Sequence, residues 1–259
     1  EPSVDPPEGE LQLPDLIVNN NILFLNKKAS SSGKIKPPTA RDLLEYYTAD
    51  QLRAHFLGLG LGIRSVGFQP KPLNPAASEK DSDPVLKEGN LLSNVFNRAV
   101  RSCFYTAQKY NDGKIPVKCI SKHVLEDACN TILEYERLMY EYNFHLVMNL
   151  MDTYIRNINK YWSKNMKEAD DKNDNDLRMQ VLADAFHMVR TAAVLMHPIA
   201  PEGTEMILDY LRLGEEFWSW ERIFEPVYSF MSNPQEHKLK FLEPRVDFFK
   251  EHPSQIIEQ

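Results

Sequence analysis

Hydrophobic residues recur every three or four positions from Val85 onward, which is the spacing of one buried helix face. The pattern predicts four long helices and a shorter fifth, over about 85–110, 122–139, 144–162, 177–196 and 201–213. Asn111-Asp112-Gly113, a polar run over 168–176 and His197-Pro198 separate them. Helices of this length with short links pack as an antiparallel bundle. The aromatic, proline-interrupted tail from Gly214 is expected to fold back along that bundle.

The first 84 residues lack this long period and predict a small mixed unit. Two apolar runs, 16–18 and 22–25, flank three asparagines and predict a β-hairpin or paired strands. Thr39 is a suitable N-cap for a short helix, a second helix is expected over 50–57, and 64–84 has the composition of a linker. The fold class is therefore mainly α, with an α/β unit over 1–84 and an antiparallel helical bundle over 85–259.

Composition and charge exclude several classes of protein. No apolar stretch of about 18 residues is long enough to span a membrane, and residues 1–10 do not have the pattern of a signal peptide. Cys103, Cys119 and Cys129 form no CxxC pair, so we expect a cytoplasmic protein without a disulfide framework or a metal site. The net charge of -7 argues against coating nucleic acid by charge alone, but it allows a local basic face.

The segment Lys28-Ala29-Ser30-Ser31-Ser32-Gly33 follows an expected strand and resembles the KMSKS loop of class I aminoacyl-tRNA synthetases. The first lysine of that motif is Lys28, or Lys27 in an alignment that keeps the usual spacing to Gly33. In the family the loop lies over the ATP triphosphate, where ammonium groups stabilise charge as pyrophosphate leaves. The resemblance implies ATP, with Mg²⁺, as the cofactor of the full-length enzyme, although serine replaces the second lysine.

A second segment, Ala49-Asp50-Gln51-Leu52-Arg53, lies about twenty residues after this loop and resembles the GADALR segment of class I enzymes. In the family this region contacts the tRNA stem. The two segments in this order are typical of class I enzymes. The resemblance therefore implies that residues 1–84 hold the end of a catalytic domain and a stem-contact region.

The stretch from Val95 to Arg101 resembles the first bundle helix of methionyl enzymes, with its Asn-x-x-x-Arg pattern. The resemblance implies that Asn97 and Arg101 bind the anticodon. Residues four apart share one helix face, where an amide can pair with a base edge and a guanidinium with a base or phosphate. The residues alone also allow two solvated polar positions opposite the buried stripe.

The stretch from Tyr154 to Trp162 resembles a further segment of the family and implies that Trp162 stacks on an anticodon base. A core aromatic at the end of an apolar stripe is the alternative. Arg156, Lys160 and Lys164 recur every four residues and form a basic stripe that could track the tRNA backbone. Such a stripe can also be a solvated helix face.

Two further segments bear on the amino acid. Leu195–Pro201 resembles the turn between the last two bundle helices of class Ia enzymes, with His197 in a structural role. Phe241–Val246 resembles the LFPRI segment that closes many methionyl enzymes and favours methionine. Tyr154-Ile155-Arg156 followed by Tyr161-Trp162 is closer to isoleucyl enzymes.

These resemblances imply an anticodon-binding part of a methionine–tRNA ligase, whose full-length form would charge tRNA with methionine using ATP. The implied partner is tRNA, with no role for DNA or a membrane. The HIGH signature does not occur, so the fragment alone is expected to be inactive. Two alternatives stay open: an isoleucyl-like class Ia synthetase, and a helical protein-interaction module that does not bind RNA.

Overall fold

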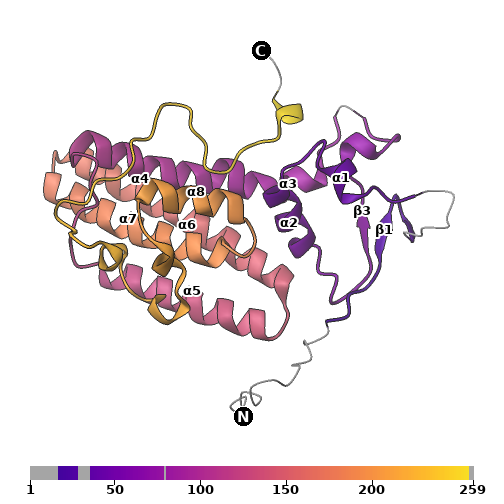
Figure 1. Cartoon of the computed structure of the whole chain (residues 1–259), viewed down its shortest axis with the longest axis horizontal. Coiled ribbons are helices and arrows are strands. Elements are labelled where there is room, and N and C mark those ends of the chain that lie inside the picture. The colour runs from indigo at the N-terminus through magenta and orange to yellow at the C-terminus, as the bar shows by residue number, and fades with distance from the viewer. Residues whose placement is uncertain (1–16, 29–35, 79, 257–259) are drawn as a thin grey trace, which may run out of the picture.

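The computed structural model describes residues 17–28, 36–78 and 80–256. A small mixed unit at the N-terminal end adjoins a long helical bundle, and the C-terminal tail runs along the bundle (Figure 1). Two clusters of buried side chains correspond to these parts, a small one in the N-terminal unit and a large one in the bundle. The prediction of a mainly α fold with a small α/β unit is confirmed.

Three short strands form the sheet of the N-terminal unit. Strand β1 (Ile22–Phe24) pairs antiparallel with β2 (Lys27–Lys28) and parallel with β3 (Val66–Phe68). The hairpin predicted around the three asparagines is wrong, because the turn lies at Leu25 and Asn26, which both have positive φ. A two-residue turn in which both residues have positive φ matches the right-handed twist of the flanking strands.

Two capped helices cover the sheet. Helix α1 (Ala40–Leu43) starts at Thr39, whose hydroxyl accepts a hydrogen bond from the backbone N–H of Asp42, as predicted. Helix α2 (Ala49–Gly58) starts at Thr48 in the same way. The expected linker over 64–84 contains β3 and a 3₁₀ turn (Lys71–Leu73), which are too short to give a period in sequence.

A continuous helical rod joins the two parts of the molecule. It consists of α3 (Pro84–Asn90), a π-helical segment (Leu91–Phe96) and α4 (Asn97–Tyr110). Val85 near its start packs in the small cluster, whereas Leu91 and Phe96 pack in the bundle core. The rod therefore has its first turn in one hydrophobic core and its remainder in the other.

The other bundle helices are α5 (Lys122–Tyr140), α6 (Phe144–Asp171), α7 (Asn175–Met196) and α8 (Pro201–Leu211). Helix α7 packs against α4, α5, α6 and α8, and nearly all of its length is buried. Helix α6 extends further than predicted, because buried Met166 and Ala169 continue its apolar face into the expected polar loop. None of the helices in the described residues is long and apolar enough to cross a bilayer.

The C-terminal tail folds back along the bundle, as expected. Arg190, fully buried on α7, donates hydrogen bonds to the backbone carbonyls of Arg222, Ile223 and Glu225. Burial lowers the pKa of Arg190 to about 10, and the three carbonyls accept from its charged form. The tail then passes α4 and ends beside α2, where Gln255 bonds Gln51 (Figure 1).

Candidate nucleic-acid interface

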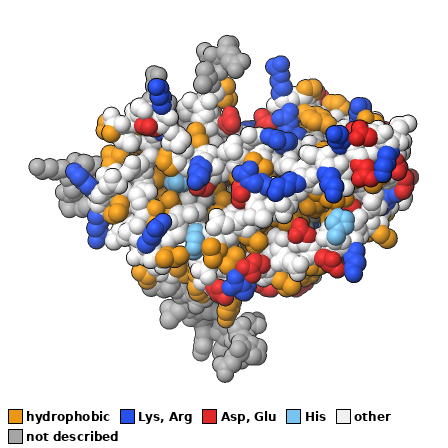
Figure 2. Space-filling model, turned by 180° about the vertical axis from the view of Figure 1, so that it is seen from behind, with side chains coloured by type: hydrophobic (Ala, Val, Ile, Leu, Met, Phe, Trp, Pro, Cys, Tyr) orange, Lys and Arg blue, Asp and Glu red, His pale blue; other side chains and the backbone are white. Residues whose placement is uncertain are grey.

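Helices α4 and α6 pack against each other, and basic side chains outnumber acidic ones on α4 and in the middle of α6. Helix α4 has Arg98, Arg101 and Lys109 and no acidic residue. The middle of α6, residues 153–167, has no acidic residue and four cations: Arg156, Lys160, Lys164 and Lys167. Figure 2 shows Lys and Arg side chains in a row across the middle of one face. These two helices give an acidic chain a locally basic surface.

Asn97 lies at the start of α4 with only 2% of its surface exposed. Its side-chain oxygen accepts a hydrogen bond from the backbone N–H of Phe248 at 2.8 Å. Its amide nitrogen donates to Asp247 Oδ1 at 2.9 Å and to the Ser93 carbonyl at 3.1 Å. In this conformation the amide holds the C-terminal tail against α4 and presents no free edge to solvent.

Arg101 lies one helical turn after Asn97, and 31% of its side chain is exposed. Its Nη1 donates to Asp247 Oδ1 at 2.7 Å. The guanidinium carbon lies 5.7 Å from the centre of the Tyr105 ring, within cation–π range. Arg101 is therefore held between an acidic and an aromatic partner while part of it stays open to a ligand.

An open pocket of about 310 Å³ brings these groups together. It is lined by side chains of the π-helical segment and the first turns of α4: Ser93, Asn94, Asn97, Arg98, Arg101, Ser102 and Tyr105. Sequence reasoning missed Arg98, Tyr105 and the nearby Asp247. The spacing of four residues from Arg101 to Tyr105 could have indicated the ring, whereas Asp247 is 146 residues away and gives no local signal.

Trp162 is half-buried and packs against the bundle core. Three residues earlier on α6, Asn159 donates a hydrogen bond to the Val95 carbonyl at 2.8 Å. Residues three apart share a helix face, so Trp162 is on the side of α6 that faces the π-helical segment and α4. The neighbouring Tyr161 points into the bundle instead, with its hydroxyl 2.7 Å from Asp184.

The basic stripe of α6 is exposed along its length. Arg156 forms an ion pair with Asp152 at 2.9 Å, one turn earlier, which offsets part of its charge. Lys160 and Lys164 continue the stripe away from that carboxylate and are also exposed. The basic stripe and Trp162 thus lie on α6, which packs against α4, the helix that carries Arg101.

Comparisons with known proteins find relatives among the aminoacyl-tRNA ligases. No family model matches the chain. The methionine–tRNA ligase of Pyrococcus furiosus is 23% identical over 254 residues, covering 96% of this chain and 32% of that protein. The Listeria monocytogenes enzyme is 27% identical over 227 residues, covering 83% and 32%. A Mycobacterium tuberculosis methionyl-tRNA synthetase, solved with methionyl-adenylate, superposes with a TM-score of 0.68 at 20% identity over 88% of this chain and 43% of that chain.

The chain is thus similar to methionyl-tRNA synthetases over most of its length, in sequence and in fold. This confirms the resemblance inferred from the sequence. An isoleucine–tRNA ligase of Picrophilus torridus is also similar, at 22% identity over 224 residues, covering 85% of this chain and 21% of that protein. The chain spans about a third of the length of the methionyl relatives it matches.

The synthetase-like loop is only partly described. Lys27 and Lys28 form β2, and both are exposed at the edge of the sheet. Ser30, Ser31, Ser32 and Gly33 lie outside the described residues. Two ammonium groups are therefore available at the start of this loop for an anionic ligand.

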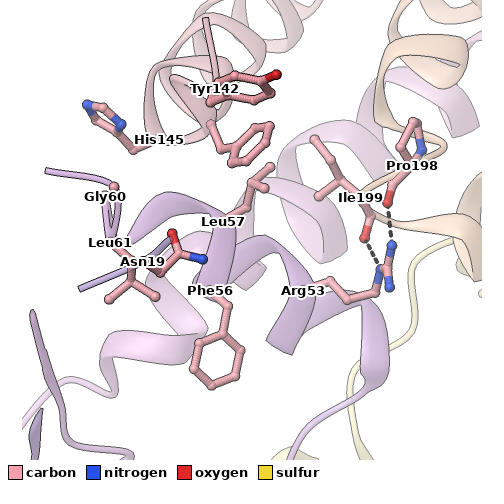
Figure 3. A pocket seen from close by; sticks show the side chains of 12 residues that line it. Asn19, Arg53, Phe56, Leu57, Gly60, Leu61, Tyr142, His145, Pro198 and Ile199 are labelled. Carbon is pink, nitrogen blue, oxygen red and sulfur yellow. Dashed lines mark hydrogen bonds between the residues drawn. The ribbon is translucent and has the colours of Figure 1, made fainter. Parts of the chain in front are cut away.

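The segment Ala49–Arg53 joins the N-terminal unit to the bundle. The buried Asp50 carboxylate accepts the backbone N–H groups of Gly203 at 2.9 Å and Glu202 at 3.3 Å, and so caps α8. Burial raises the pKa of Asp50, and these two hydrogen bonds oppose the rise. Arg53 donates to the carbonyls of Pro198 and Ile199 in the turn before α8 (Figure 3).

A pocket lies at this joint, between the end of α2 and two turns of the bundle (Figure 3). It is lined by Phe56 and Leu57 of α2, by Tyr142 in the turn before α6 and by His145 in the first turn of α6. Gly60, at φ +70°, lies so close to the His145 ring that a Cβ there would touch it at 3.5 Å. The segment that resembles a stem-contact element thus also has a structural role, since its charged side chains bind the bundle.

Proposed function

We propose that this chain binds tRNA through its anticodon loop, as the C-terminal part of a methionine–tRNA ligase. One observation carries the proposal: the acid-free helix α4 and the acid-free middle of α6 lie side by side in a chain of net charge -7. Phosphate binding requires such a local excess of Lys and Arg. The similarity to methionine–tRNA ligases over most of the chain supports the same assignment.

Each group of the interface would have a separate task. Arg156, Lys160 and Lys164 would contact phosphates, which position the RNA without reading its sequence. Arg101, half-exposed in its pocket, would bond a base edge, and Trp162 would supply an apolar ring for stacking. Asn97 would act indirectly by holding Asp247 and the tail beside Arg101.

For the full-length enzyme we propose ATP-dependent joining of methionine to tRNA in the cytoplasm, with Mg²⁺. When bound, ATP would supply the adenylyl group that activates the carboxyl group of the amino acid, with pyrophosphate as the leaving group. The exposed Lys27 and Lys28 begin the loop that would lie over its triphosphate. We expect no activity from this fragment alone, because the chain contains no HIGH-type segment.

A second candidate is a helical protein-interaction module. Large aromatic side chains are exposed on α5 and the tail, with Tyr140 at 85%, Phe224 at 48% and Trp220 at 41%. Exposed apolar groups of this size mark protein contacts when they are contiguous. Binding through them would depend weakly on salt, whereas binding through phosphates weakens steeply as salt rises.

The test is binding of the full chain to the anticodon stem-loop of a methionine tRNA, measured by fluorescence anisotropy at several salt concentrations. Stem-loops with each anticodon base changed serve as controls. We expect affinity that falls with salt and that is lost when the anticodon changes. Equal binding of every anticodon would reject methionine-specific reading, and no binding at low salt would favour the protein-interaction module.

A further inference from the structure

A second pocket, of about 410 Å³, lies between the last two turns of α5, the end of α7 and the tail. Four aromatic side chains line it: Tyr135 and Tyr140 of α5, and Trp218 and Trp220 of the tail. It shares no lining residue with the α4 pocket. The proposed RNA interface therefore uses none of these rings, and their clustering needs a separate explanation.

The rings of this pocket are held in place by neighbouring side chains. The imidazole of His197 stacks on the indole of Trp218, with the ring centroids 3.9 Å and the planes 11° apart. His197 is held in turn by a contact between its Nδ1 and the Thr204 hydroxyl at 3.0 Å. The ring centroid of Trp220 lies 6.3 Å from that of Tyr135. A ligand would therefore meet a wall that is largely preformed.

Two polar groups in the same wall are unsatisfied. The Tyr135 hydroxyl and the Trp218 indole N–H are buried, and neither has a hydrogen-bond partner among the described residues. Tyr135 as a whole is only 4% exposed. Such groups are rare in native folds, and each calls for an explanation such as a functional role. That two of them belong to one pocket marks it as a candidate ligand site.

The pocket is negatively charged as well as aromatic. Glu136 is its only carboxylate, and none of the residues that line it is Lys or Arg. Helix α5 ends at Tyr140, so the partial negative charge of its C-terminus lies at the same place. The next residue, Arg137, pairs with both Glu134 and Glu141, and these two carboxylates offset its charge. The pocket should therefore attract cations and repel anions.

We propose that this aromatic pocket binds a quaternary ammonium group. The negative faces of aromatic rings attract such a cation, and its methyl groups fit an apolar wall. A metal ion would lose its water and gain a single carboxylate, that of Glu136. A primary ammonium would leave N–H donors unpaired against the rings, whereas a quaternary one has none. A neutral apolar ligand would gain nothing from Glu136.

The experiment titrates the ¹⁵N-labelled full chain with choline chloride at pH 8 and follows the indole N–H signals of its three tryptophans by NMR. The signals of Trp218 and Trp220 should shift and saturate, whereas Trp162 on α6 is an internal control that should not move. Sodium chloride at equal concentration controls for ionic strength. The uncharged isostere of choline, 3,3-dimethylbutan-1-ol, should bind about 5- to 30-fold more weakly, the range of cation–π attraction in a partly desolvated site.

Two variants test the wall and the charge. Trp220→Leu keeps an apolar side chain but removes the aromatic face, and it should weaken choline binding about 5- to 30-fold, measured on the Trp218 signal. Phe224→Leu, at an exposed ring of the tail outside the pocket, is its control. Glu136→Gln should weaken binding about 2- to 5-fold, the range of a solvated charge contact. Glu126→Gln removes an exposed carboxylate earlier on α5 and should keep the wild-type affinity.

Three results would overturn the inference. The first is the absence of a saturable shift at Trp218 and Trp220. The second is equal affinity for choline and its uncharged isostere, which would show an apolar pocket without preference for charge. The third is wild-type choline affinity in Glu136→Gln and Trp220→Leu, with melting curves to identify folded variants; the exposed position of Glu136 keeps the test valid if Trp220→Leu does not fold.

A peptide that contains trimethyllysine distinguishes the source of the quaternary ammonium group. Binding tighter than that of choline would mean that a polypeptide carries the group, and equal or weaker binding would mean a free small molecule; both results support the site. None of these measurements involves RNA. The inference and the proposed function can therefore fail independently of each other.

Discussion

At the scale of single residues, the interface depends on how a few polar groups divide their hydrogen bonds. Asn97 uses its amide within the protein, whereas Arg101 donates Nη1 to Asp247 and Nη2 to the Tyr105 hydroxyl at 3.5 Å, with 31% of its side chain exposed. A half-exposed ion pair of this kind adds little to stability. Loss of Arg101 should therefore affect binding, and loss of Asn97 should affect the fold as well.

Replacing Arg101 by alanine should weaken stem-loop binding by about 5- to 150-fold, the range of one good base contact. The free energy of unfolding should change by less than about 1 kcal/mol, because the lost ion pair is partly solvated. Binding isotherms and urea denaturation measure the two effects. Arg137→Ala, on α5, removes an equally charged side chain with two carboxylate partners and should leave binding unchanged. Full affinity in Arg101→Ala would contradict the assignment.

Replacing Asn97 by alanine should lower the free energy of unfolding by about 1–3 kcal/mol, because buried partners on the tail lose their hydrogen bonds. In the native state the side-chain oxygen of Asn97 accepts a hydrogen bond from the backbone N–H of Phe248. This N–H should therefore exchange its hydrogen faster in Asn97→Ala than in the wild type. Asn149→Ala, at an exposed position of α6, is the control and should change neither quantity. Unchanged protection at Phe248 would mean that Asn97 does not hold the tail.

At the scale of elements, α4 and α6 work as a pair because each supplies a different contact. Helix α4 provides the pocket with Arg101, and α6 provides the basic stripe and Trp162. A helix repeats its face every 3–4 residues, so lysines at i and i+4 form one row at the spacing that a phosphate chain can follow. The stripe should therefore contribute to affinity without contributing to selectivity.

The double change Lys160→Ala and Lys164→Ala should weaken binding of all anticodon variants to a similar extent. The slope of log K against log salt should become shallower by about 1.4, at about 0.7 for each lost contact with single-stranded RNA. Anisotropy titrations over a salt series measure this slope. Lys122→Ala on α5, 89% exposed and paired with Glu126, is the control that should keep the wild-type slope. A selective loss for one anticodon would contradict the assigned role.

At the scale of the whole molecule, the net charge of -7 hides an uneven distribution. Helix α8 carries Glu202, Glu205 and Asp209 and no basic residue, whereas α4 carries only basic ones. The average net charge therefore describes neither helix surface.

The bundle core also contains polar groups that titrate, and α7 buries His187 to 1% exposure near Asp184 and Arg190.

Acid should destabilise the whole fold through His187. Burial, and next the charge of Arg190, lowers the pKa of His187 to about 4 from 6.5. Between pH 4 and pH 6.5, therefore, His187 is protonated in the unfolded chain and neutral in the folded chain. The stability contributed by neutral His187 is complete above pH 6.5 and is lost as the pH falls to about 4, at most about 3 kcal/mol.

Urea denaturation at pH 7, 6 and 5 measures this loss. His187→Gln cannot titrate, so its free energy of unfolding should change less over the same range than that of the wild type. His123, at an exposed position of α5, provides the matched control, and His123→Gln should keep the wild-type dependence. Parallel pH curves for His187→Gln and the wild type would exclude His187 as the source.

The sequence by itself determined the helices and several of their ends. The three-to-four-residue period, the N-cap Thr39 and Pro201 at a first turn all act within a few neighbouring residues, so they can be read locally. Periodicity also placed Arg101, Trp162 and the basic stripe on helices that prove to be adjacent, whereas the proposed roles of Arg101 and Trp162 came from the resemblance.

The tertiary structure alone decided which groups meet. The pairing of β1 with β3, the cap that Asp50 provides for α8, and the bonds from Asp247 to Asn97 and Arg101 join residues that are 44 to 153 positions apart. Such contacts leave no period and no spacing in the sequence, because their cost in chain entropy is offset only by packing of the complete bundle. The position of Asp247 beside Asn97 and Arg101 therefore depends on the tail lying along α4.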